Sequence, residues 1–390
     1  VNIMKHINLL LFLTLICLSC SSNNSTEQES ELANISDDFK SYTLDIDLPQ
    51  KRFADLIASV EVIRLEETDN SLLSYIRNLQ KTDDYLVFTI SGPESDVFVF
   101  DRNGNSVRKI NRKGNGPEEY DNISDLWLES DTLVIYSRQE SKILRYDLKG
   151  NFIKSQKLPN RVGHIYGYKN GYAMEMNRYP LNDTSYYRYA TLDQNLEISG
   201  SYIPFDDKME GMIYFSNNSI TPYKDGVTLF RMMSDTVYRL SENRFTPFVH
   251  FDFGSDWYWT ESNPVAVEFG DIMQTTDKVW RAVAHMGDRR IWAIPYSGYS
   301  NETAPPSFSI DRSNGRIDAV DMTKADKPNS VAVPLAWDKD QLIFTVQSPD
   351  MRSFLSELSQ DQIKFRQGTT LEQIESSGNP VLIWVKFKDF

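Results

Sequence analysis

The sequence predicts an all-β fold, a six-bladed β-propeller closed by an N-terminal strand, with a small helical insertion in the last blade. Three observations support this prediction. A hairpin turn recurs at a fixed period, short strands bounded by turn residues fill the chain from about residue 59 onward, and one early strand has no unit of its own. The propeller is expected over residues 41–390, after a signal segment over 1–20 and a flexible polar tether over 21–40.

The recurring turn follows the pattern aromatic-Asp-x-x-Gly-Asn. It occurs at residues 100–105 and 146–151, with a degenerate copy at 192–195, and the aspartates are separated by 147 − 101 = 46 and 193 − 147 = 46 residues. An Asp side chain at this place accepts backbone N–H bonds, and Gly supplies a positive φ without Cβ strain. A period in the forties predicts one four-stranded sheet per repeat, in which these turns are structural rather than ligand-binding.

Six units of β-branched and aromatic runs follow one another, each bounded by Gly, Pro, Asn or Asp. The strands are expected at 85–90, 96–100 and 106–110; 123–129, 132–137, 142–146 and 152–158; 171–176, 186–192 and 197–203; 227–231, 235–240 and 245–253; 281–284, 290–294, 307–311 and 316–320; and 330–335, 341–346 and 380–387.

The sixth unit lacks an outer strand, whereas the segment 60–65 is a spare strand before the first unit. A ring must close, because an open blade edge promotes aggregation. We therefore expect residues 60–65 to complete the last blade beside 381–387. Two helix-like stretches, 350–358 and 371–375, are expected outside the ring as an insertion.

The N-terminus has the pattern of an export signal. Lys5 and His6 precede an apolar run over 7–18, which is shorter than the roughly 20 residues needed to span a bilayer. The run ends in Leu-Ser-Cys, which resembles a bacterial lipobox, so we expect cleavage before Cys20 and lipidation of its sulfur. The alternative is an ordinary secretory signal with an incidental cysteine.

Composition narrows the possible partners. The formal net charge of −14 argues against non-specific nucleic-acid binding and against flat adsorption on anionic lipid, so we expect no nucleic-acid partner and membrane contact only through a lipid anchor. The chain has two cysteines, both near the end of the signal segment, and four histidines. We therefore expect no disulfide, no metal site and no cofactor.

One loop resembles a known family. Residues 112–120, Arg-Lys-Gly-Asn-Gly-Pro-Glu-Glu-Tyr, resemble the Arg-Lys-Gly-x-Gly-Pro-Gly-Glu-Tyr motif of six-bladed β-propeller lipoproteins of Bacteroides-type bacteria, which are similar to NHL-repeat propellers. The segments 235–240 and 379–382 also agree, and Glu118 stands where the family usually has Gly. The resemblance covers roughly residues 45–390. It implies a cell-envelope location, here that of an outer-membrane lipoprotein, and no established activity.

This loop is the first candidate ligand site. It joins an outer strand to the next inner strand and is expected at the rim near the central channel, where Arg112, Lys113, Glu118 and Tyr120 could contact a ligand. No Gly-Lys-Ser/Thr follows, so the loop does not match a phosphate-binding loop. The alternative is that it only fixes blade one to blade two.

The second candidate lies in the long connection after the fourth unit. Trp257 and Trp259 flank a tyrosine there, and clustered aromatic rings suit stacking on sugars or peptide side chains. The alternative is that the rings cover edges between blades. The long connections 204–222 and 254–279 are the places where function is most expected.

Catalytic patterns are weak. His164 and His285 lie in separate units with no Ser-His-Asp spacing, so each is expected at the surface or in an inter-blade hydrogen bond. A carboxylate pair for glycoside chemistry stays open, because its separation is a three-dimensional quantity. The sequence therefore favours a lipid-anchored binding or scaffold module for a glycan, a peptide or an envelope protein. The alternative is a propeller-scaffold enzyme, a lyase or hydrolase, with its site at the channel mouth.

Overall fold

The computed structural model describes residues 38–92, 95–177, 179–182, 185–205, 219–259, 277–297, 306–323, 332–366 and 368–389. Contacts divide the chain into two units, 1–32 and 33–390, and all described residues belong to the second. The predicted signal segment, Cys20 and nearly all of the tether lie outside the described residues. So do large parts of the long connections 204–222 and 254–279.

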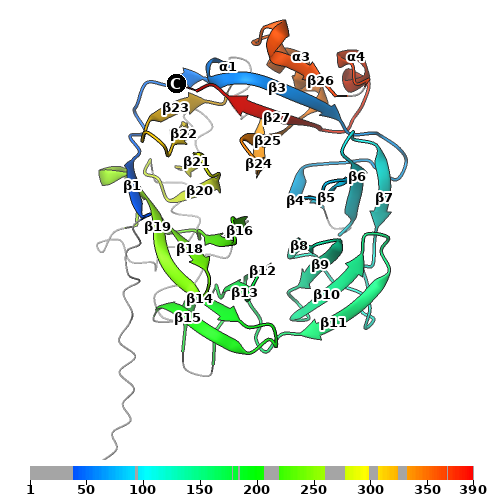
Figure 1. Cartoon of the computed structure of the whole chain (residues 1–390), viewed down its shortest axis with the longest axis vertical. Coiled ribbons are helices and arrows are strands. Elements are labelled where there is room, and N and C mark those ends of the chain that lie inside the picture. Colours follow the sequence, from blue (N-terminus) through cyan, green and yellow to red (C-terminus); the bar gives the residue numbers. More distant parts are fainter. Residues whose placement is uncertain are drawn as a thin grey trace, which may run out of the picture. The chain divides into compact units, whose positions relative to one another are not determined.

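The second unit is a ring of six antiparallel sheets, as the sequence predicts (Figure 1). Blades 1 to 3 are four-stranded and follow the chain order from the centre outward. Their strands are β4 (Ile76–Lys81), β5 (Tyr85–Ile90), β6 (Val97–Asp101) and β7 (Ser106–Ile110); β8 (Asp125–Glu129), β9 (Thr132–Ser137), β10 (Lys142–Asp147) and β11 (Phe152–Lys157); and β12 (His164–Tyr168), β13 (Gly171–Glu175), β14 (Tyr187–Leu192) and β15 (Ile198–Pro204).

Blades 4 and 5 have the same meander with a fifth strand added at the outer edge. Blade 4 contains β16 (Ile220–Tyr223), β17 (Gly226–Leu229), β18 (Thr236–Ser241) and β19 (Arg244–Asp252), and blade 5 contains β20 (Arg281–Met286), β21 (Arg290–Tyr296), β22 (Ser307–Asp311) and β23 (Ile317–Asp321). The added strands are β1 (Lys40–Thr43) beside β19 and β2 (Lys51–Arg52) beside β23, both parallel to their neighbours. The sequence analysis did not predict these additions.

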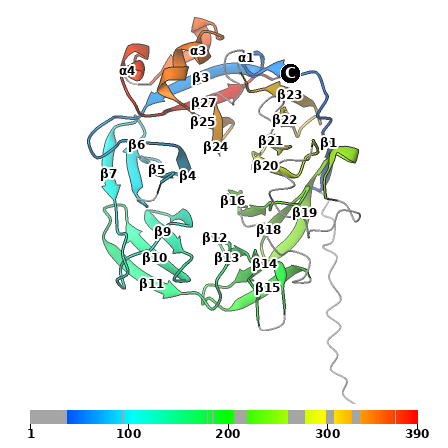
Figure 2. The same cartoon turned by 180° about the vertical axis from the view of Figure 1, so that it is seen from behind.

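Blade 6 combines an N-terminal strand with strands from the C-terminal part of the chain. Its order is β24 (Val333–Asp338), β25 (Gln341–Val346), β27 (Val381–Phe387), β3 (Ile57–Arg64) and β26 (Ile363–Phe365). β3 pairs antiparallel with β27, with Val62 opposite Ile383. The predicted ring closure by the strand around residues 60–65 is therefore confirmed, and the view from behind shows the same neighbours (Figure 2).

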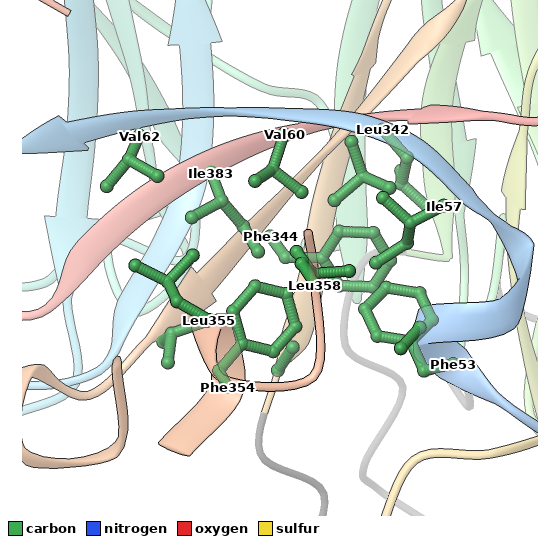
Figure 3. Packing of buried hydrophobic residues seen from close by; sticks show 14 of the residues in the cluster. Phe53, Ile57, Val60, Val62, Leu342, Phe344, Phe354, Leu355, Leu358 and Ile383 are labelled. Carbon is green, nitrogen blue, oxygen red and sulfur yellow. The ribbon is translucent and has the colours of Figure 1, made fainter. Parts of the chain in front are cut away.

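The predicted helical insertion lies between β25 and β27. It contains α3 (Met351–Leu355) and α4 (Leu371–Glu375), and a short helix α1 (Phe53–Leu56) precedes β3. Figure 3 shows the cluster of apolar side chains that unites these parts. Phe354 of α3 packs near Phe53 of α1, with ring centroids 6.1 Å apart, so the insertion covers the closing blade and does not enter the ring. Within the described residues there are also three single-turn 3-10 helices, at Gly254–Asp256, Ser348–Asp350 and Gln360–Gln362.

The repeated turns owe their shape to the aspartate. Asp101 accepts hydrogen bonds from the backbone N–H groups of Asn103 and Asn105 at 2.8 and 2.9 Å, and Asp147 does the same in blade 2. Gly104 has a φ of 86°, and a Cβ there would lie 2.0 Å from the Arg64 carbonyl oxygen. The turn of blade 1 therefore packs directly against the end of the closing strand.

The first strands of the six blades (β4, β8, β12, β16, β20 and β24) surround the centre of the ring (Figure 1). In each four-stranded meander, the turn from the first to the second strand and the turn from the third to the fourth lie at the same end. We call this end of the ring the turn face. Within the described residues, no helix is long and apolar enough to cross a membrane.

Candidate functional site

A cavity of about 810 Å³ opens on the turn face between blades 6, 1 and 2. The first-to-second-strand turns of all three blades contribute to it, together with one residue of the repeated turn in blade 1. We call it the charged cavity, because it is lined by four basic residues, four aspartates and few apolar groups: Lys81, Thr82, Asp83, Asp84, Arg102, Leu128, Ser130, Asp131, Asp338, Lys339, Gln341, Arg366 and Trp384.

Asp338, the last residue of β24, is the hub of the charged cavity. Its carboxylate lies 3.2 Å from the Lys81 ammonium and 3.0 Å from an Arg102 guanidinium nitrogen, and it accepts a hydrogen bond from the Trp384 indole N–H at 2.9 Å. These partners come from β4, the blade 1 turn and β27. The carboxylate therefore ties blade 1 to blade 6 at the floor of the charged cavity.

These contacts determine the protonation state of Asp338. Burial by itself raises the pKa of the Asp338 carboxyl, but the Trp384 hydrogen bond and the Lys81 and Arg102 cations outweigh it and lower the pKa to about 2. Asp338 is therefore ionised throughout the physiological range. Because three donors already occupy it, it serves to orient the cations around it.

Two guanidinium groups cover the indole of Trp384. Arg366 lies 5.1 Å and Arg102 5.9 Å from the ring centroid, within the range of cation–π attraction. Arg366 forms a two-nitrogen ion pair with Glu61 and donates a third hydrogen bond, at 2.7 Å, to the Arg102 carbonyl. Trp384 itself is only 1% exposed, so it supports the cations and offers no stacking surface.

Arg102 differs from the other partly buried cations, Lys81 and Arg366, because two of its guanidinium nitrogens are not engaged by any described residue. One guanidinium nitrogen, Nη2, binds Asp338, whereas Nε and Nη1 have no hydrogen-bond partner among the described residues. The side chain lines the charged cavity and is 28% exposed. The floor thus presents an oriented guanidinium with donors available to a ligand.

The rim of the charged cavity is mostly acidic. Asp83, Asp84, Asp131 and Lys339 are all exposed. Three carboxylates and one ammonium therefore surround an opening whose floor is cationic. In the described part of the chain, no group of three or more His, Cys, Asp or Glu side chains is placed to hold a metal ion.

The sequence analysis treated the repeated turns as purely structural, and it therefore missed Arg102. The aspartates of these turns do play a structural part, but the next position varies: Arg102 in blade 1, Leu148 in blade 2 and Gln194 in blade 3. In a fourth turn that the sequence analysis overlooked, in blade 5, Arg312 reaches back to blade 4 and lies 4.7 Å from the Phe248 ring. An arginine directly after the turn aspartate therefore reaches the preceding blade. This position can be read from the sequence, and it would have identified Arg102 as a candidate.

The predicted loop 112–120 lies against the third and outermost strands of blade 2. The Arg112 guanidinium donates two hydrogen bonds to the Gly150 carbonyl, at 3.1 and 2.9 Å. The Tyr146 hydroxyl donates to the Glu118 carbonyl at 2.7 Å. These contacts are those expected of a loop that fixes blade 1 to blade 2, and they lie away from the first strands at the channel.

Tyr120 is fully buried at the end of this loop. Its hydroxyl donates to the Ser95 carbonyl at 2.9 Å, and burial raises its pKa to about 12. Lys113 pairs with Tyr120 through an isolated backbone bridge. Ligand binding by Arg112, Lys113, Glu118 and Tyr120 stays a prediction. Only those of their atoms that face solvent are able to contact a ligand.

The aromatic pair after blade 4 is also engaged by neighbours. Trp257 is 8% exposed and stacks on Phe253 with ring centroids 5.5 Å apart. The Trp259 indole N–H donates to the Trp280 carbonyl at 2.6 Å. Trp257 and Tyr120 belong to different hydrophobic clusters, so the two predicted groups form separate places, and a binding role for the tryptophans stays a prediction.

Both histidines considered in the sequence make inter-blade hydrogen bonds, as expected. His164 of β12 lies 2.7 Å from the Asp125 carboxylate of β8 through its Nδ1 atom. His285 of β20 shares a hydrogen bond with the Leu335 backbone of β24, and burial lowers its pKa to about 4. His285 is therefore neutral at physiological pH.

Comparison with known proteins supports the architecture. No curated protein matches the sequence significantly. A Bacteroides fragilis protein named as a candidate exported protein is 14% identical, with a TM-score of 0.71 over 90% of this chain and 100% of that chain. A member of the DUF4221 family from Bacteroides vulgatus is 10% identical, with a TM-score of 0.50 over 85% of this chain and 97% of that one. At these identities the likeness shows the fold alone.

One family model also matches the sequence, over residues 41–386, and thus covers the entire ring. Its description is "Domain of unknown function (DUF4934)". The expectation of a six-bladed propeller family is thereby supported. The chain belongs to the DUF4934 family.

Proposed function

We propose that this protein is a lipid-anchored binding or scaffold module of the cell envelope, and that it holds its ligand in the charged cavity. The observation that carries the proposal is the charged cavity itself: an opening of about 810 Å³ at the end of the ring, built by three blades. Its volume lies within the roughly 300–1,000 Å³ that is usual for ligand sites. The ligand class drawn from the sequence is a glycan, a peptide or an envelope protein.

The anchor is supported by the sequence. The apolar run over 7–18, the Leu-Ser-Cys junction at Cys20 and the acidic, polar residues after it are typical of an exported lipoprotein. The motif at 112–120 supports placement among the propeller lipoproteins that are similar to NHL-repeat proteins. Replacement Cys20→Ala is expected to move the protein from the membrane fraction to the soluble fraction or to block its processing.

Binding is favoured over catalysis at this site by the state of its central carboxylate. General bases work best when their pKa lies near the working pH, and the pKa of Asp338 is about 2. The enzyme alternative rests on a different observation, the pairing of His164 with Asp125 at 2.7 Å. It predicts turnover of an envelope polysaccharide that His164→Gln abolishes.

The test of the binding function is capture of the ligand from the native envelope. Wild-type protein is compared with Asp131→Trp, which places a large ring at the rim of the charged cavity. The matched control is Asp288→Trp, an exposed aspartate in the corresponding turn of blade 5. A glycan or protein retained by wild type and the control but lost by Asp131→Trp supports the proposal. Equal retention by all three proteins contradicts it.

A further inference from the structure

We propose that the charged cavity recognises a saccharide that carries a single carboxylate, a residue of the uronic acid class, and that Arg102 pairs with that carboxylate. This inference rests on the proposed binding function and names its ligand. It follows from three properties of the charged cavity: the donors that remain on Arg102, the balance of charge in the floor, and the chemistry of the rim.

Arg102 is held in place but not saturated. Nη2 is fixed on Asp338 at 3.0 Å, the guanidinium lies over the Trp384 ring, and the backbone carbonyl accepts from Arg366. Nε and Nη1 have no partner in the described chain. A guanidinium fixed in this way loses little freedom when it binds, and charge-assisted bonds to a carboxylate are the strongest hydrogen bonds it can make.

The other two cations of the floor are already paired. Lys81 lies 3.2 Å from Asp338 and donates to the Trp337 carbonyl at 2.5 Å. Arg366 binds Glu61 through two nitrogens.

Three partly buried cations therefore face two carboxylates, Asp338 and Glu61, which leaves 3 − 2 = 1 positive charge in the floor. One negative charge on a ligand balances it.

The rim argues against a ligand with many negative charges. Asp83, Asp84 and Asp131 are exposed around the opening, opposed by Lys339 alone. These carboxylates repel a polyanion such as a phosphorylated chain. They are good acceptors for hydroxyl donors, which a sugar presents around its ring.

The lining also argues against a peptide. Most of the binding energy of a protein interface comes from a few large side chains, chiefly aromatic residues and arginine, seated in well-packed pockets. Among the lining residues only Leu128 offers accessible apolar surface, because Trp384 is 1% exposed. A ligand with polar groups on all sides fits this lining better, and an acidic saccharide combines such groups with the one carboxylate that the floor requires.

The experiment is a calorimetric titration of the full-length protein in detergent with three probes: a trisaccharide with one galacturonate residue and two neutral sugars, the same trisaccharide with its carboxyl group reduced, and an end-blocked tripeptide with one aspartate. We expect the acidic trisaccharide to bind at least tenfold more tightly than the other two. Arg102→Gln should weaken that binding at least tenfold and leave binding of the reduced trisaccharide unaffected, and Arg102→Lys should recover part of the loss. Melting temperatures of the variants confirm that each is folded.

Arg289→Gln is the matched control. Arg289 also lies on the turn face and pairs with an aspartate, Asp311, at 3.1 Å, but it does not line the charged cavity. Its replacement should leave binding unchanged.

Equal binding of the acidic and reduced trisaccharides, tighter binding of the peptide, no binding of any probe, or an unchanged affinity in Arg102→Gln would each overturn the inference. The binding function would still stand if the envelope capture by wild type is lost in Asp131→Trp, and both proposals fall if it is not.

Discussion

At the scale of single residues, two adjacent positions of one turn serve the fold and the candidate site. Asp101 holds the hairpin by accepting two backbone N–H bonds, and the next residue, Arg102, enters the charged cavity. Gly104 lets the same turn approach the closing strand. The residue that shapes the turn and the residue that lines the charged cavity are thus adjacent in the chain.

The requirement for glycine at this turn can be measured against a matched position. Gly104 and Gly315 have φ values of 86° and 77°, but only at Gly104 would a Cβ meet backbone, 2.0 Å from the Arg64 oxygen. Gly315→Ala should therefore cost about 1 kcal/mol from positive φ alone. Gly104→Ala should cost about 3 kcal/mol or more, since the clash adds to the strain. Urea unfolding of both variants checks this, and equal costs would contradict the packing described here.

Asp338 makes the stability of the protein depend on acid. Its pKa is about 2 in the folded protein, against 3.8 for an aspartate without such partners. The stabilisation, about 2 kcal/mol, is therefore fully present above pH 4 and is lost as the pH falls towards 2. Asp338→Asn should remove this part of the pH dependence and lower stability at neutral pH. Asp83→Asn, at the exposed rim, is the control. An unchanged acid profile in Asp338→Asn would show that the carboxylate does not carry this charge.

At the scale of elements, the outer edges of the blades fall into two groups. The edges of blades 4, 5 and 6 are covered by the short parallel strands β1, β2 and β26. No described strand covers the outermost strands of blades 1, 2 and 3, which carry the exposed apolar residues Val107, Ile153 and Ile198. Lysine and arginine side chains on β7 and β11 are a common protection against pairing with another chain.

The insertion in blade 6 contributes core as well as covering the ring. Phe354 is 4% exposed and belongs to the cluster that includes Phe53 and Phe344, whereas Phe365 of β26 is 39% exposed. Phe354→Ala should destabilise the protein by about 3–4 kcal/mol and Phe365→Ala by less than about 1 kcal/mol. The midpoints of urea unfolding measure both. A small effect of Phe354→Ala would mean that the insertion packs loosely.

The sequence predicts the elements that depend on neighbouring residues better than those that depend on residues far apart in the chain. Local alternation and turn residues predict most strands of the six blades, and the one unpaired strand predicts the closure. The innermost strands β4, β12 and β16 are not among the expected ranges. The added strands β1 and β2 contain four and two residues, too few for a periodic pattern, and they exist only because a blade edge is nearby. The charged cavity is still harder to predict from the sequence, because Lys81, Arg102 and Asp338 are brought together only by ring closure.

At the scale of the whole ring, the N-terminal strand β3 and the C-terminal strand β27 meet in one sheet. β3 supplies the strand that blade 6 lacks, and its pairing with β27 covers an edge that would otherwise be open. Glu61 of the same strand holds Arg366 in the charged cavity. Closure of the ring and assembly of the candidate site are therefore one event.

Truncation tests this coupling. A chain that begins at residue 66 lacks β1, β2 and β3, and we expect it to aggregate or to lose its cooperative melting transition. A chain that begins at residue 38 retains all three strands and should melt as the full-length protein does. Size-exclusion chromatography and circular dichroism provide the comparison. A monomeric, cooperatively melting chain from residue 66 would show that the ring does not depend on its N-terminal strand.

The central claim is that the ligand occupies the charged cavity, and amide hydrogen exchange with and without the captured ligand tests it most directly. We predict that protection appears in the turns at 81–84, 128–131 and 338–341, which line the charged cavity, and in the blade 1 turn around Arg102. Protection confined to the loop 112–120 or to residues 257–259, with no change at the turn face, would contradict the account and place binding where the sequence motifs predict it.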